Sequence, residues 1–217
     1  FYGGGAAGRA GGIIRIDPTT GMQTVISPAG SFVYPFGIAI DPVGNLIVVD
    51  TDFFTGIHRF VRVDPTTGTQ MTFSDDVPIS PGGVAVDPDG TIFMSLEAGF
   101  GSPDGAVIRV DPTTGAPTVV SSGGFLTDSL GIAIDATGDL LVTDLNGGDP
   151  GRIVRIDPVT GAQSLVSEGD SLRDPIGIRA DDIDHMGHVN NSVYLKWVQD
   201  AVVKFWETAA RPKPSRG

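Results

Sequence analysis

The chain has 217 residues, with 14 basic and 26 acidic side chains, a formal net charge of −12 at pH 7 and no cysteine. The absence of cysteine excludes disulfides, thiolate metal sites and a cysteine nucleophile. An acidic chain repels a phosphate backbone, and no apolar stretch approaches the roughly 20 residues of a membrane helix, so we expect neither nucleic acid nor a membrane as a partner.

The chain opens with FYGGGAAGRAGG. This stretch lacks the basic start and the apolar segment of a secretory signal peptide, so none is predicted and the compartment stays open. Two runs of alternating apolar residues follow at 13–17 and 23–27 and predict two strands.

Two phrases then recur along the chain. The phrase (I/V)-R-(I/V)-D-P-x-T-G places its aspartate at positions 17, 64, 111 and 157. A second phrase, G-(I/V)-(A/R)-(I/V/A)-D, places its aspartate at 41, 87, 135 and 181, so the period is 46–48 residues. Each period holds four short runs with β-type alternation, which in the first full unit are 36–41, 46–50, 60–64 and 70–74.

The D-P-x-T-G phrase predicts a tight turn between two strands. Proline fixes φ near −65°, and glycine adopts the positive φ that reverses the chain. We therefore interpret the recurring aspartates as turn residues and not as catalysts: Asp17, Asp64, Asp111 and Asp157. The arginines two residues earlier are expected to pair with neighbouring aspartates: Arg15, Arg62, Arg109 and Arg155.

Residues 10–181 resemble the β-propeller repeats of NHL-type, streptogramin-lyase-like and gluconolactonase-like proteins, through phrases such as FGIAIDPVGNLIVVD. The resemblance implies an all-β fold, a partial β-propeller of about three and a half four-stranded repeats over residues 1–180. A solenoid of hairpins is the alternative. Propellers host many activities, so the resemblance implies a binding or scaffold module, with a propeller lactonase or lyase as a further alternative.

The repeats are broken at both ends. The chain opens with the two outer strands of a blade, and the last unit stops after its inner strand at 176–178, so a composite blade lacks one strand. Three outcomes are open: the tail supplies that strand, a second chain completes a larger ring, or the chain is a fragment. We expect self-association or a missing segment that completes the propeller.

From residue 182 the pattern changes to DIDHMGHVNNSVYLKW, and the composition changes with it. Residues 1–180 carry the whole net charge of −12, whereas 181–217 are neutral and hold every lysine and tryptophan. Apolar residues from Val193 to Trp206 recur with helical spacing and predict a C-terminal amphipathic α-helix. The chain is thus predicted to have two domains, 1–180 and 181–217.

Residues 176–208 resemble the N-terminal motif of hotdog-fold acyl-CoA thioesterases of the 4-hydroxybenzoyl-CoA type. The matching positions are Asp182, Asp184, Gly187, His188, Val189, Asn190, Asn191, Tyr194 and Trp197. The resemblance implies a thioester hydrolase in which Asp184 is nucleophile or general base and a coenzyme A thioester is the substrate. Substrate contacts would come from the helix start: His188, Val189, Asn190 and Asn191. The sheet of that family does not follow, so the chain has the character of a chimera.

Three further features invite a metal site. His185 and His188 lie near two aspartates, the Asp144–Asp149 loop offers oxygen ligands, and Glu97 replaces the aspartate that ends the equivalent strands. None of these has the spacing of a known zinc or EF-hand site. We therefore predict no metal and no cofactor, and we expect turns and strand ends at these positions.

Overall fold

The computed structural model describes residues 11–28, 32–52, 55–75, 81–97, 104–146 and 150–169, together with 172, 175, 177 and 178. The chain divides into two units, Phe1–Ala180 and Asp181–Gly217. Every described residue lies in the first unit, so the predicted C-terminal helix lies outside the described residues.

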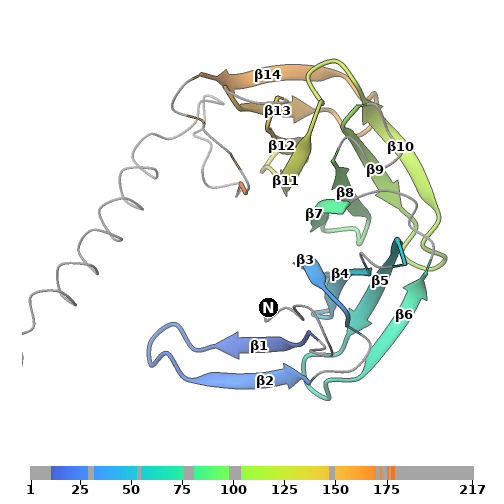
Figure 1. The fold of residues 1–217 in the computed structure, drawn as a ribbon, viewed down its shortest axis with the longest axis vertical. Coiled ribbons are helices and arrows are strands. Elements are labelled where there is room, and N and C mark those ends of the chain that lie inside the picture. Colours follow the sequence, from blue (N-terminus) through green and yellow to red (C-terminus); the bar gives the residue numbers. More distant parts are fainter. Residues whose placement is uncertain are drawn as a thin grey trace, which may run out of the picture. The chain divides into compact units, whose positions relative to one another are not determined.

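The described residues are all-β and form four sheets (Figure 1). The N-terminal sheet has two strands, β1 (Ile13–Ile16) and β2 (Gln23–Ser27). The first blade comprises β3 (Pro35–Ile40), β4 (Leu46–Asp52), β5 (Ile57–Val63) and β6 (Gln70–Ser74). The second comprises β7 (Pro81–Val86), β8 (Ile92–Leu96), β9 (Ala106–Val110) and β10 (Pro117–Ser122). The third comprises β11 (Ser129–Ile134), β12 (Leu140–Asp144), β13 (Arg152–Ile156) and β14 (Gln163–Glu168).

Each blade is an antiparallel meander in which strands adjacent in sequence pair with one another. The first strands β3, β7 and β11 contact one another in turn, and the last strands β6, β10 and β14 form the outer edges (Figure 1). This arrangement is that of a partial β-propeller, as the repeats predict. Among the described residues, no helix has the length and apolar character that a membrane crossing requires.

The apolar core lies between the sheets. One cluster joins the first and second blades through residues such as Ile47, Phe60 and Met94, and a second joins the second and third blades. A third cluster, which includes Ile13 and Val61, joins the N-terminal sheet to the first blade. Successive side chains of a strand point to opposite faces of its sheet, so they face the preceding and the following sheet in turn. One apolar core layer therefore lies at each joint, the place where two neighbouring sheets meet.

The four D-P-x-T-G turns form as predicted. The carboxylate of Asp64 accepts hydrogen bonds from the backbone N–H groups of Thr66 and Thr67 at 2.7 and 3.2 Å. The same pattern occurs at the other three turn aspartates: Asp17, Asp111 and Asp157. These backbone donors stabilise the ionised carboxylates and hold their pKa values below the ordinary value. The expected turn role of these aspartates is confirmed.

Candidate functional site

The end of β4 carries a fully buried carboxylate, Asp50. Its oxygens accept the backbone N–H of Val33 at 2.8 Å and that of Tyr34 at 2.8 Å. The guanidinium of Arg59 on β5 donates to the same carboxylate at 2.7 Å. Asp50 therefore fixes the segment that leads into β3, and both of its oxygens are engaged.

The third blade repeats this arrangement at Asp144, which is also fully buried. Its carboxylate accepts the N–H groups of Thr127 and Asp128 at 2.8 and 2.9 Å, and the hydroxyl of Ser129 at 2.9 Å. The Nε of Arg152 lies 3.9 Å from Asp144 Oδ1. The N–H of Asn146 also donates to this carboxylate, and the next three residues of the predicted loop, 147–149, lie outside the described residues.

The second blade lacks both charges. Leu96 pairs with Pro81 and Ala106, as Asp50 pairs with Pro35 and Arg59. The sequence comparison that put Glu97 in the place of the strand-end aspartates is therefore wrong by one residue, and Leu96 occupies that position. Aspartate and arginine are replaced together by two apolar residues, which leaves no buried charge without a partner.

One titratable ring is buried at the hairpin between β4 and β5. His58 is 9% exposed, and its Nδ1 lies 3.2 Å from the hydroxyl of Thr51 on the paired strand. Burial disfavours the imidazolium and lowers the pKa of His58. His58 belongs to no motif of the sequence, and the register of this hairpin brings it against Thr51.

Two of the recurring arginines, Arg62 and Arg109, link neighbouring blades. Arg62 is 3.7 Å from Asp41 of its own blade and donates to the carbonyl of Pro112 in the second blade at 3.0 Å. Arg109 donates to the carbonyl of Pro158 in the third blade at 2.9 Å. Arg155 pairs with Asp135 and Asp139 of its own blade. The predicted pairing with aspartates is thus observed for Arg62 and Arg155, whereas Arg109 binds a backbone carbonyl.

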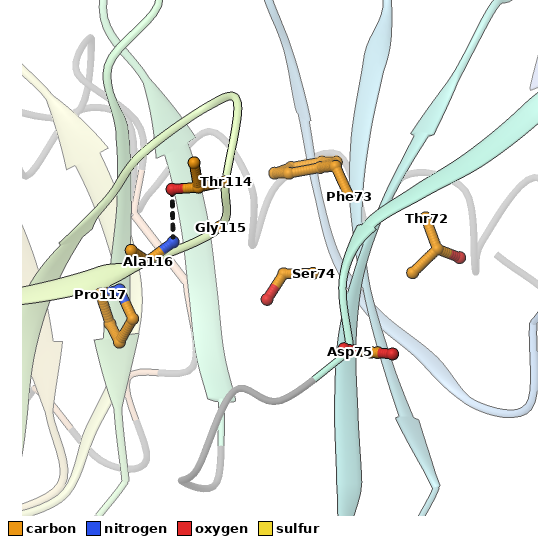
Figure 2. Close-up of a pocket in the computed structure, with 8 residues that line it drawn as sticks. All are labelled: Thr72, Phe73, Ser74, Asp75, Thr114, Gly115, Ala116 and Pro117. Atoms are coloured by element: carbon orange, nitrogen blue, oxygen red, sulfur yellow. Dashed lines mark hydrogen bonds between the residues drawn. The ribbon is translucent and has the colours of Figure 1, made fainter.

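Open grooves run beside the outer strands. One lies between β6 and the following blade's turn, encloses about 450 Å³ and is lined by Thr72, Phe73, Ser74, Asp75, Thr114, Gly115, Ala116 and Pro117. Figure 2 shows Phe73 and Ser74 pointing from β6 towards this turn. A second groove, beside β10, is lined by Arg109, Thr118, Val119, Val120, Pro158, Val159 and Thr160. It shares three positions of the repeat with the first groove. Both grooves combine hydroxyl groups with apolar surface and border an edge strand.

The residues predicted for thioester hydrolysis lie outside the described residues: Asp184, His188, Val189, Asn190 and Asn191. His185 and Asp149 lie outside them as well. Within the part of the chain that the structure describes, no three histidine, aspartate or glutamate side chains are grouped so that they could hold a metal ion.

Residues 178–214 match the Thioesterase-like superfamily. No curated protein matches the chain. Among solved structures, the chain is similar to one in a nidogen/laminin complex, with 19% identity, a TM-score of 0.62, and coverage of 77% of this chain and 60% of the other.

Two further solved structures share this similarity. TolB from Acinetobacter baumannii has 20% identity and a TM-score of 0.56, over 72% of this chain and 38% of that protein. Virginiamycin B lyase from Staphylococcus aureus has 18% identity and a TM-score of 0.52, over 72% and 48%. At these identities the similarity concerns the fold, which supports a β-propeller module. The chain spans 60% of the first of these structures and less than half of the other two.

Proposed function

We propose that the β-propeller part of this chain is a binding or scaffold module that holds an extended polypeptide in the grooves beside its outer strands. The observation that carries the proposal is an open groove beside the outer strand at two places, between β6 and the turn of the second blade and between β10 and the turn of the third blade. An edge strand presents unpaired backbone N–H and C=O groups to which an extended peptide adds as a further strand.

Several described charged residues support the same proposal, because their contacts stabilise the fold. Asp50 and Asp144 bind backbone N–H groups, the turn aspartates close hairpins, and Arg62 and Arg109 link blades. One structural neighbour comes from a complex of nidogen with laminin, so the fold is compatible with protein recognition.

Selection of peptides from a displayed random library on the full chain, followed by calorimetric titration of a selected peptide, tests the proposal. Thr72→Arg and Val119→Arg each place a large charge in one groove. We expect either substitution to weaken peptide binding about tenfold or more. Val43→Arg, at a position 83% exposed on the turn between β3 and β4, is the control and should bind as the wild type does. Binding unchanged by both groove variants would contradict the proposal.

The match of residues 178–214 supports a second candidate, a thioesterase-like hydrolase. In this reading Asp184 attacks or activates water against a coenzyme A thioester, and backbone N–H groups near Val189 to Asn191 stabilise the oxyanion. The assay measures the hydrolysis of short-chain acyl-CoA by detecting the coenzyme A thiol that is released. Turnover by the wild type that is lost in Asp184→Asn would support this function, and no turnover above the uncatalysed rate would exclude it for those substrates.

A further inference from the structure

The joints between neighbouring sheets reuse the same parts. At each joint, the D-P-x-T-G turn of the following sheet lies against the outermost strand of the preceding sheet. The turn glycine has a positive φ and no space for a side chain, because a Cβ would overlap the preceding strand. The contacts are Gly68 with Ile26, Gly115 with Ser74, and Gly161 with Val120. Ile26, Phe73 and Val120 occupy equivalent positions of the repeat, and the carbonyl oxygen of Phe73 lies 3.1 Å from the Cβ position of Gly115.

A glutamine–serine hydrogen bond secures two of these joints. Gln163 donates to the hydroxyl of Ser121 at 2.9 Å, and Gln70 donates to the hydroxyl of Ser27. Both serines are buried, at 7% and 0% exposure. The glutamine follows the turn in one sheet, and the serine lies near the end of the outermost strand of the preceding sheet. This hydrogen bond therefore links the two neighbouring sheets directly.

The N-terminal sheet carries the turn side of such a joint, and no strand among the described residues lies against that turn. Gly21 has a φ of 70°, like Gly68 and Gly161, but no atom lies within 4 Å of the position of a Cβ. Ile16 is 55% exposed, whereas its counterparts in the three blades are fully buried: Val63, Val110 and Ile156. Gln23 occupies the position of Gln70 and Gln163. We call Ile14, Ile16, residues 17–21 and Gln23 the leading face.

The third blade carries the strand side of the same joint. Val166 and Ser167 on β14 occupy the positions of Val120 and Ser121 on β10, and Ser167 is only half-buried. Arg155 occupies the position of Arg62 and Arg109, each of which donates to the proline carbonyl of the following blade's turn. We call Arg155, Val166 and Ser167 the trailing face.

We propose that the leading face of one copy of this chain docks on the trailing face of a second copy and builds a further joint of the same kind. Gly21 would lie against the backbone of Val166, Gln23 would donate to Ser167, and Arg155 would donate to the carbonyl of Pro18. The occupant is a second copy because the two faces complement each other residue by residue. Such a head-to-tail interface closes into a ring or continues as an open chain of copies. This inference is independent of the proposed peptide binding.

Sedimentation velocity of the full chain over a concentration series tests the interface. We expect the wild type to self-associate, and Ile16→Asp on the leading face or Ser167→Arg on the trailing face to weaken association about tenfold or more. An equimolar mixture of the two variants should form a dimer and nothing larger, because each variant contributes its one intact face. Val159→Asp changes a residue that is 88% exposed beside the groove at β10, and it should leave association unchanged.

Circular dichroism checks that each variant is folded, and Gln23→Ala is a milder leading-face variant should Ile16→Asp unfold. A wild type that stays monomeric throughout, variants that associate like the wild type, or a mixture that stays monomeric would each overturn the proposal.

The absence of cysteine allows a direct test of which chain occupies the trailing face. Cysteines introduced by Gln23→Cys and Ser167→Cys, treated with a short bismaleimide, should give covalent dimers and higher oligomers. The matched control pairs Gln23→Cys with Val159→Cys and should remain monomeric. If the cross-link forms only within one chain, the leading face docks on the trailing face of its own chain. That result would refute docking on a second copy.

Discussion

The carboxylate of Asp50 and the guanidinium of Arg59 meet at 2.7 Å between paired positions of β4 and β5, and the second blade has replaced both residues, with Leu96 and Ala106. The two partners of the pair differ in their surroundings. The side chain of Asp50 is fully buried, whereas that of Arg59 is 26% exposed. The backbone N–H groups that Asp50 binds therefore matter more to stability than the ion pair itself.

This difference predicts unequal costs for the two partners. Asp50→Leu should lower the free energy of unfolding by about 1–3 kcal/mol, because the N–H groups of Val33 and Tyr34 lose their acceptor. Arg59→Ala should cost less than Asp50→Leu, because the N–H groups of Val33 and Tyr34 stay bound to the buried carboxylate. Urea unfolding of both single variants and of the double variant measures these terms. An Arg59→Ala variant as unstable as Asp50→Leu would show that the ion pair dominates.

The turn glycines give a second prediction with an internal control. Gly21 and Gly161 have φ values of 70° and 72°, so alanine pays a left-handed backbone cost of about 1–2 kcal/mol at either position. At Gly161 the new Cβ would also overlap the carbonyl of Val120, whereas Gly21 faces open space. Gly161→Ala should therefore be about 1–3 kcal/mol less stable than Gly21→Ala in urea unfolding at low protein concentration. Equal losses would mean that the turn does not dock as described.

The turn aspartates predict loss of stability in acid. Their pKa values lie below the ordinary value of 3.8 because backbone N–H groups bind the ionised carboxylates. The unfolded state then takes up protons first, so these groups stabilise the fold above about pH 3.8, and the contribution disappears as pH falls through the lower folded pKa. Changing all four, Asp17, Asp64, Asp111 and Asp157, to asparagine should flatten the acid side of a curve of unfolding free energy against pH. A curve identical to that of the wild type would contradict this account.

The buried His58 predicts a pH effect in a higher range. Burial lowers its pKa below 6.5, so the unfolded chain binds a proton that the folded chain resists. Stability should be level above pH 6.5 and should fall as the pH drops from there towards the folded pKa. His58→Gln should remove this slope in thermal or urea unfolding, and His185→Gln serves as the control. A slope that persists in His58→Gln would assign it to another group.

The strands and turns could be predicted from the sequence because their signals are local. Alternation and D-P-x-T-G placed the run at 70–74 where β6 lies, and the run at 60–64 overlaps the longer β5, which ends one residue earlier. The extension of β5 back to Ile57 was missed, because its first residues, IHR, do not alternate in the expected way. The pairing of Thr51 with His58 in the hairpin is what adds them to the strand.

The contacts between blades could not be predicted in the same way. Arg62 and Pro112 are 50 positions apart, and nothing within either stretch indicates that a guanidinium meets that carbonyl. The error of one residue at Glu97 has a related cause. Glu97 resembles the strand-end aspartates in its chemistry, but the pairing of Leu96 with Pro81 shows that Leu96 occupies their position. Features that depend on how one sheet lies on the next need the coordinates.

The repetition of one joint along the chain has a consequence for how such a gene changes. Each blade meets its neighbours through the same turn, outermost strand and apolar layer. A whole unit gained or lost by unequal recombination therefore recreates a joint that already works and demands no compensating substitution. Selection can adjust the number of blades in such a lineage far more easily than it can redesign any single one of them.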